Sequence, residues 1–385
     1  MVVPREDDGA VAVLVAGLAV LLFFFGAVAV DVSRLHQERR DVQNGADAAA
    51  LALAQTCGAG GCDSDDQSTM QTLAQQYADT NARDFDAAAT GDARGGSNIE
   101  EICGEGAAGL VACSWLPFDP PGNGYVMVRT RTGTATSAGV VPPVLARLFA
   151  GDGWDTGSSG EAPLGQRRTY AIAAWGAPAG VTAQLPLTFS QCELNALTGA
   201  DVGDPVYADP QALDPALERV IYFHDTVQAG TCTAGPSGAD LPGGFGWLES
   251  DGCQAVVEDG WYGDKTGAAI PNDCKKSNPD CKFGENGEPV ANCLEKYVGQ
   301  VVRIPIYDIT NGLTGTNGEY HLADYAAFYL TGYRFPSSSY ASPDLGVPCA
   351  SKQTCLSGYF VEDTAGGGKV TDGPSWGLTV YQLVG

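Results

Sequence analysis

Residues 9–30 have the sequence GAVAVLVAGLAVLLFFFGAVAV, and residues 31–56 continue with DVSRLHQERRDVQNGADAAALALAQT. The second segment has no proline and a single glycine, and it is rich in alanine, which favours helix. Its apolar residues recur at the spacings of one helix face: Leu35, Val42, Ala46, Ala49 and Leu53. Together the two segments predict one helix of roughly 70 Å at about 1.5 Å per residue. The glycines of Gly58-Ala-Gly-Gly61 are expected to end it.

The first segment predicts a transmembrane helix at residues 9–30, after a cytoplasmic tail at residues 1–8. Its 22 residues carry no charge, and as a helix they would span about 33 Å, the thickness of one bilayer core. A cleaved signal peptide is the alternative, because Ala27-Val28-Ala29 forms an A-x-A site. The retained anchor is favoured, because the apolar run is longer than a usual signal-peptide core.

Composition excludes several classes of partner. The chain of 385 residues has 21 Lys and Arg against 46 Asp and Glu, a formal net charge of −25. Such an acidic protein has no excess of cations to displace counterions from phosphates, so we expect no nucleic acid partner. For the same reason, we do not expect a cluster of basic residues that binds anionic lipid.

The cysteine content indicates an oxidising compartment. The chain has 12 cysteines and no C-x-x-C pair, which is typical of disulfides rather than of a zinc site. Four lie before residue 180 and eight after it, so each part can pair internally. Close candidate pairs are Cys57–Cys62, Cys103–Cys113 and Cys349–Cys355, although spacing alone leaves the connectivity open.

Orientation follows from weighing two signals. Arg34, Arg39 and Arg40 follow the apolar run while only Arg5 precedes it, which by the positive-inside rule places the bulk of the chain in the cytoplasm. Twelve thiols constrain the compartment more strongly than a few arginines. We therefore expect a single-pass protein of the cell membrane with its N-terminus in the cytoplasm and the bulk outside.

Beyond the helix, the sequence predicts an α+β protein in two parts. Residues 57–178 suggest a small α/β head, with a helix at 67–85, a short helix at 142–150, and strands at 125–132 and 168–175. Residues 179–385 suggest a disulfide-rich, mainly antiparallel β domain. Its strand candidates lie at 219–224, 300–306, 326–331 and 377–383.

The sequence contains few motifs that indicate catalysis or the binding of a metal or cofactor. It lacks the common nucleophile, zinc-protease and phosphate-loop motifs, so we predict no enzyme and no catalytic, cofactor or metal site. The histidines His36, His224 and His321 are expected to be structural or solvated, although His224-Asp225 is the best acid–base pair. The acids of Asp63-Ser-Asp65-Asp66 and those at 308–319 match an EF-hand loop only in part. The aromatic run 242–247 is expected to form a tight turn over a core, and an exposed aromatic loop for a partner or a sugar is the alternative.

The N-terminal motif resembles the TadE/TadG-like family of the Tad, or Flp-type, pilus assembly system of bacteria. The resemblance covers residues 8–55 and rests on polar positions that a membrane helix does not need: Asp31, Arg34, Gln43, Asn44 and Asp47. Two departures stand out. The position five residues after Gly9 is Leu14 rather than the glutamate usual at prepilin cleavage sites, and the Asp-x-Ser-x-Ser motif of a metal-dependent adhesion site is absent.

The resemblance implies a non-enzymatic pilus component, a minor pilin or pilus-assembly protein. Its partners would be other Tad pilus components, inner-membrane assembly proteins and, through residues 9–30, membrane lipid. A membrane-anchored adhesin or binding protein that joins no filament is the alternative. We further expect the face formed by Val42, Ala46, Ala49 and Leu53 to pack partly on the head of its own chain and partly on a partner helix.

Overall fold

The computed structural model divides the chain into two compact units. Unit 1 comprises Met1–Pro120, Gly124–Ala173 and Leu383–Gly385, and unit 2 comprises Pro121–Asn123 and Ala174–Gln382. The structure describes residues 8–63, 67–81, 99–131, 168–185, 187–200, 204–222, 245–248, 255–258, 260–263, 293–311, 318–335, 338–351, 353–366 and 368–385.

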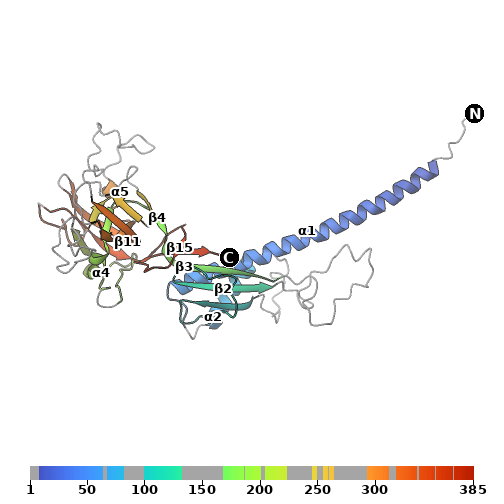
Figure 1. Cartoon of the computed structure of the whole chain (residues 1–385), viewed down its shortest axis with the longest axis horizontal. Coiled ribbons are helices and arrows are strands. Elements are labelled where there is room, and N and C mark those ends of the chain that lie inside the picture. The colour runs from blue at the N-terminus through green and yellow to red at the C-terminus, as the bar shows by residue number, and fades with distance from the viewer. Residues whose placement is uncertain are drawn as a thin grey trace, which may run out of the picture. The chain divides into compact units, whose positions relative to one another are not determined.

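Unit 1 begins with the long helix α1, Asp8–Gly58, which confirms the predicted continuous helix (Figure 1). The helix ends where the glycines predicted it. Gly60 has φ 79°, a left-handed conformation that favours glycine. The Gly61 N–H donates to the Thr56 carbonyl at 2.8 Å and the Gly60 N–H to the Cys57 carbonyl at 3.0 Å. This pair of bonds is the Schellman motif, which satisfies carbonyls at the end of a helix.

The transmembrane helix predicted at residues 9–30 is helical but is not supported as a membrane span. Among the described residues, no helix combines the length and the hydropathy expected of a segment that crosses a bilayer.

The rest of unit 1 is a small α/β head, as expected. Helix α2, Gln67–Asn81, buries Met70, Ala74 and Ala78, and α1 packs on α2 and on strand β2. The strands are β1, Ile99–Glu105, β2, Gly124–Arg131, and the start of β3, Arg168–Pro178, in the sheet order β1-β2-β3. The last residues of the chain lie beside β3, because the Ile172 N–H donates to the Gly385 carbonyl at 2.7 Å.

Unit 2 is built mainly of β-strands. The shorter elements are β4 Gly180–Ala183, β5 Leu187–Ser190, α4 Gln191–Thr198, η2 Pro215–Leu217, β6 Arg219–Tyr222, β7 Phe245–Trp247, β8 Ala255–Glu258, β9 Gly260–Gly263 and α5 Cys293–Tyr297. They are followed by β10 Val301–Thr310, β11 Glu319–Phe335, β12 Ser338–Tyr340, β13 Cys355–Val361, β14 Asp363–Thr364, β15 Val370–Thr371 and β16 Leu378–Leu383.

One eight-stranded sheet dominates unit 2. Its order is β6-β13-β11-β10-β5-β7, and β9 and β12 both pair with the long strand β11. In the described residues, its strand pairs are antiparallel except for β10 with β5, which run parallel. Strands β4 and β8 form a separate antiparallel pair. The predicted strands in this part of the chain are therefore present, and β11 extends well beyond the predicted 326–331.

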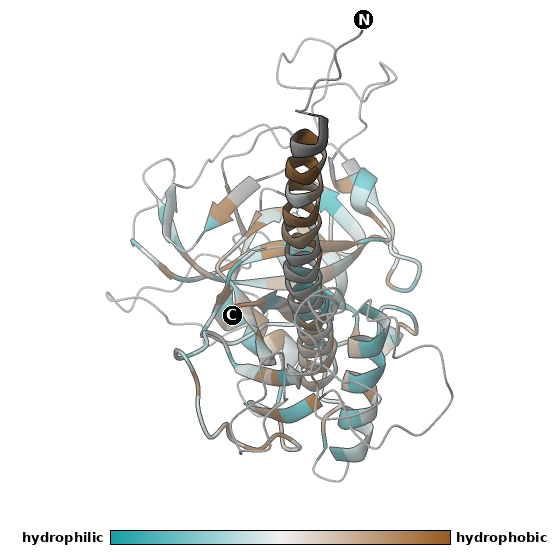
Figure 2. Ribbon diagram, turned by 90° about the vertical axis from the view of Figure 1, so that its right-hand side faces the viewer, coloured by the Kyte–Doolittle hydropathy of each residue, from teal (hydrophilic) through white to brown (hydrophobic). Residues whose placement is uncertain are grey.

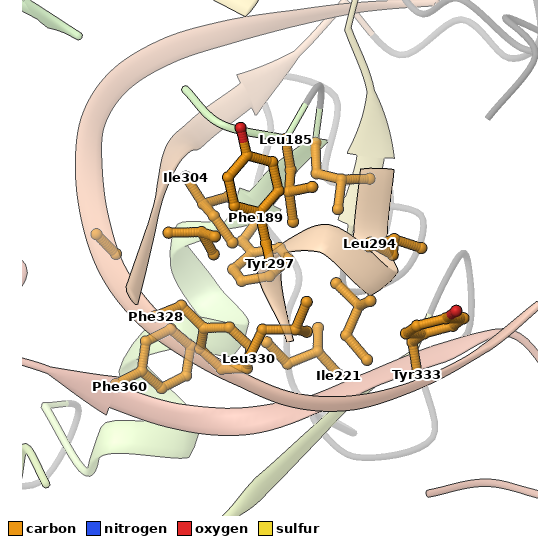
Figure 3. Packing of buried hydrophobic residues seen from close by; sticks show 14 of the residues in the cluster. Leu185, Phe189, Ile221, Leu294, Tyr297, Ile304, Phe328, Leu330, Tyr333 and Phe360 are labelled. Carbon is orange, nitrogen blue, oxygen red and sulfur yellow. The ribbon is translucent and has the colours of Figure 1, made fainter. Parts of the chain in front are cut away.

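The core of unit 2 lies between this sheet and helices α4 and α5 (Figure 3). Phe189, Phe328 and Phe360 pack edge to face, with ring centroids 5.1–6.3 Å apart. Leu294 and Tyr297 of α5 are also buried in the cluster. Burying such a side chain stabilises a fold by about 1.5–3 kcal/mol, so this cluster is the main source of stability in unit 2.

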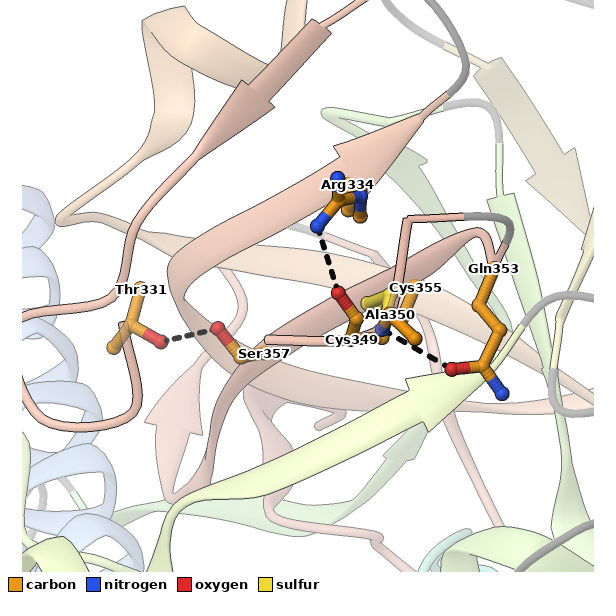
Figure 4. Close-up of a disulfide and its surroundings, with 7 residues drawn as sticks. All are labelled: Thr331, Arg334, Cys349, Ala350, Gln353, Cys355 and Ser357. Carbon is orange, nitrogen blue, oxygen red and sulfur yellow. Dashed lines mark hydrogen bonds between the residues drawn. A yellow bond between two sulfur atoms is a disulfide. The ribbon is translucent and has the colours of Figure 1, made fainter. Parts of the chain in front are cut away.

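Disulfides close short loops in both units. All three candidate close pairs form: Cys57–Cys62, Cys103–Cys113 and Cys349–Cys355. Figure 4 shows the third, where Arg334 Nη1 donates to the Cys349 carbonyl at 2.9 Å and fixes the disulfide loop on β11. Cys192 is also disulfide-bonded, and no free cysteine occurs in the described part of the chain.

One expectation about local structure is corrected. Phe245–Trp247, predicted to lie in a tight turn, forms strand β7 and pairs with β5, because alternate residues of both segments can join the sheet ladder. Several other predicted features lie outside the described residues: the helix at 142–150, the His224-Asp225 pair, residues 242–244 and the end of the helix at 82–85.

Candidate interaction surface of helix α1

The C-terminal half of α1 is buried within unit 1. Val42 is 5% exposed, and Ala46, Ala49 and Leu53 are fully buried. This confirms the predicted face and its packing on the head of the same chain. Contact of this face with a partner helix, which the sequence also predicted, stays a prediction, because the four side chains are buried within their own chain.

A polar network joins the same part of α1 to strand β3. The Gln43 side-chain N–H₂ group donates to Asp47 Oδ1 at 2.7 Å and to the Tyr170 carbonyl at 3.1 Å. The Thr169 hydroxyl donates to Gln43 Oε1. One amide therefore connects a helix turn to a strand that follows it by more than a hundred residues.

The polar positions of the motif thus differ in role. Gln43 and Asp47 are half-buried members of the network, whereas Asn44, predicted to neighbour Asp47, is exposed. The sequence did not indicate Thr130, Thr169 or Tyr170 as their partners. Thr130 is buried, and its hydroxyl donates to the Val42 carbonyl at 3.3 Å. An alternating strand pattern predicts which face of the sheet such residues occupy. It does not predict which turn of which helix they contact.

The N-terminal half of α1 presents an apolar surface (Figure 2). Its large side chains are 42–73% exposed: Val11, Val13, Leu14, Val15, Leu18, Val20, Leu21, Leu22, Phe23, Phe24 and Phe25. Contiguous exposed apolar surface of this extent marks an interaction site for protein or lipid. This exposed apolar surface continues, along the same helix, into the buried C-terminal part that packs in unit 1.

The residues considered for chemistry lie apart from this surface and from one another. His36 is exposed on α1. His321 Nδ1 lies 2.8 Å from Asp308 Oδ1, and both side chains are partly exposed. Asp63 is exposed, while the rest of its acidic run and residues 312–317 lie outside the described residues. Within the described ranges, no three His, Cys, Asp or Glu side chains gather as a metal site would require.

A pocket of about 460 Å³ lies between α2 and β1. Its lining includes Gln67, Met70, Glu101 and Leu110, and among its lining residues there is no His, Cys, Lys or Arg. The pocket therefore offers carboxylate, amide and hydroxyl groups without a histidine, lysine, arginine or thiol beside them.

One buried carboxyl group in unit 2 stands out electrostatically. Asp324, on β11, is 5% exposed, and burial raises its pKa from the usual 3.8 to about 7. The Tyr325 N–H, which donates to Asp324 Oδ1 at 2.8 Å, favours the charged form and opposes that rise. Burial likewise raises the pKa of Tyr359 to about 12. Sequence reasoning did not identify Asp324, because an acidic residue within an alternating strand pattern is expected on the exposed face.

Comparison with known proteins bears on α1 alone. Residues 9–56 match the family model described as "Putative Flp pilus-assembly TadE/G-like". No curated protein and no solved structure matches the chain. The matched residues coincide with α1 almost from end to end, and they include both its exposed apolar half and the Gln43–Asp47 network. Over residues 9–56, this chain is therefore similar to the TadE/G-like Flp pilus-assembly family.

Proposed function

We propose that the chain is a non-enzymatic component of a Tad-type pilus, a minor pilin or pilus-assembly protein of the cell envelope. The observation that carries the proposal is the match of residues 9–56 to the TadE/G-like family model. The family's system implies association with other pilus-assembly components. Helix α1 suits such a role, because one half is fixed in a folded head and the other half presents apolar surface.

The anchor and the orientation are the finer part of the proposal. Residues 9–30 carry no charge, and the exposed side chains among them cost about 25 cal/mol per Å² of apolar surface in water. In the proposal, bilayer lipid covers this surface, the N-terminus lies in the cytoplasm, and the head of unit 1 and the whole of unit 2 lie outside it. The disulfides in both units support the second point, because such bonds persist in oxidising compartments.

The absence of catalysis is also proposed. Of the described histidines, His36 is solvent-exposed on a helix and His321 is held by Asp308. The pocket between α2 and β1 has no basic side chain or thiol in its lining. Hydrolytic catalysis usually needs a nucleophile with an adjacent base, and in this pocket no histidine or lysine is available as that base.

Deletion of the gene, followed by electron microscopy of the cell surface, tests the pilus role. We expect filaments to be lost or shortened, and to return when the wild-type chain is expressed from a plasmid. Immunolabelling of the head then separates a minor pilin, found along filaments, from an assembly protein, found only at the envelope. Unchanged filaments in the deletion strain would reject the pilus role and favour an anchored adhesin.

A further inference from the structure

We propose that unit 2 carries a docking site for a lysine side chain of a partner protein, formed by Trp261 and the neighbouring carboxylates at the end of the β9-β11-β10 ladder. The inference is independent of the pilus role, because it rests on unit 2 alone. It begins with the exposed aromatic ring of Trp261.

Trp261 is 51% exposed although it lies in a paired strand. Strand β9 pairs with the first residues of β11, with Trp261 opposite His321 and Gly263 opposite Glu319. On β11, Tyr320 and Leu322 point into the core, so Glu319 and His321 lie on the outer face with Trp261. Trp261, Glu319 and His321 therefore lie together on the outer face of the sheet, where β9 pairs with the start of β11.

Neighbouring residues hold the indole ring in place. The ring of His321 lies 5.3 Å from the ring of Trp261, centroid to centroid. His321 is in turn held by Asp308, at 2.8 Å. A β-bulge between Tyr307 and Ile309 brings the Asp308 carboxylate to this face, since the pairing register shifts at that point. A fixed ring loses little entropy on binding, so the site is preorganised.

The charge around the ring is negative. Glu319 is exposed, its carboxylate accepts a hydrogen bond from Asn311 Nδ2 at 3.2 Å, and it occupies a diagonal cross-strand position from Trp261. Asp308 supplies a second carboxylate. A tryptophan face attracts cations through its quadrupole, and tryptophan is the strongest side chain in this respect. Both effects favour a cation over an anion or an apolar group.

A comparison within the chain shows that the ring of Trp261 is available. In the described part, Arg129 lies 5.4 Å from the centroid of Trp115 and Lys296 lies 4.9 Å from that of Tyr297, whereas Trp261 has no such cation. Trp115 is 48% exposed and so nearly matches Trp261. The net charge of −25 adds long-range attraction for a basic partner. A compact ammonium group suits a single exposed ring beside carboxylates.

Titration of the full chain with acetyl-trilysine amide, followed by saturation-transfer NMR, tests the site. We expect Trp261→Ala to weaken binding about 2–5-fold, the range for an exposed cation–π contact. Glu319→Gln should weaken it as well, and Trp115→Ala should leave it unchanged. The same peptide with its three ε-amino groups acetylated should not bind.

Three outcomes would overturn the proposal. Equal binding by wild type, Trp115→Ala and Trp261→Ala would mean that net charge alone attracts the peptide. Equal binding of the acetylated peptide would mean that the surface is apolar rather than cation-selective. Binding of cellotetraose that depends on Trp261, with no binding of the lysine peptide, would assign the ring to a saccharide. Because Trp261 is half-exposed, its truncation leaves the core of unit 2 intact, and Glu319→Gln provides a second, isosteric variant.

Discussion

Gln43 and Asp47, one turn apart on helix α1, are joined by a hydrogen bond of 2.7 Å between Nε2 and Oδ1. Gln43 Nε2 also donates a hydrogen bond to the Tyr170 carbonyl, and Gln43 Oε1 accepts one from the Thr169 hydroxyl. Two polar positions in the segment that matches the TadE/G-like family model therefore connect the helix to the sheet of its own unit. Their role in this chain is the internal placement of α1.

The first prediction concerns this network. Gln43→Ala removes the shared amide and leaves the partly buried Asp47 carboxylate without its donor, so we expect unit 1 to lose about 1–3 kcal/mol of stability. Denaturant unfolding of the full chain measures the change. Asn44→Ala, at the adjacent exposed position, is the matched control and should stay within about 0.5 kcal/mol of wild type. Similar values for the two variants would mean that the network contributes nothing to stability.

The second prediction concerns the buried face of α1. Ala49 is fully buried, so Ala49→Glu places an unpaired charge in the core of unit 1 and should unfold the head. We expect rapid cleavage of unit 1 in limited proteolysis. Asn44→Glu introduces the same charge at an exposed site of the same helix and should resist cleavage like wild type. If the Ala49→Glu head resists protease and only pilus assembly fails, the result would instead support contact of this face with a partner helix.

The third prediction tests the proposed anchor. Val20 is 60% exposed in the middle of the apolar half of α1. Val20→Arg should impair membrane insertion by about 2.5–3.5 kcal/mol, the cost of arginine near a bilayer centre. Carbonate extraction of membranes measures the retained fraction. Val20→Leu should behave as wild type, and full retention of the arginine variant would show that residues 9–30 are not the anchor.

The fourth prediction is a pH dependence of unit 2. In the folded chain the pKa of Asp324 is about 7, against an ordinary value of 3.8. An unfolded chain therefore releases this proton first as pH rises. The stability that Asp324 contributes is fully present below about pH 4 and is lost as pH rises through 7, a change of roughly 4 kcal/mol.

Urea denaturation between pH 4.5 and 8 checks this dependence. Asp324→Asn cannot ionise, so the stability of wild type relative to this variant should fall with rising pH over that range. Asp204→Asn changes an exposed carboxyl group and should show no such trend. A constant difference between wild type and Asp324→Asn would mean that the Asp324 carboxyl group ionises at an ordinary pH.

The sequence alone determined the features that depend on neighbouring residues. The 3.6-residue spacing of Val42, Ala46 and Leu53 predicted both the helix and the face that it buries. The glycines after Cys57 predicted the end of this helix, because glycine adopts the left-handed conformation of a helix terminus at little cost in energy. Strand positions followed for the same reason. Close spacing made three cysteine pairs candidates, but the structure decided that they form.

Only the tertiary structure decided which distant groups meet. Gln43 forms a hydrogen bond with Tyr170, which lies 127 residues later in the chain. Asp308 contacts His321 because of a β-bulge that no local sequence pattern predicts. The burial of Asp324, and with it the raised pKa, likewise depends on what covers β11. A strand pattern of period two states which face a side chain occupies, but the register between elements is set by the packing of the whole unit.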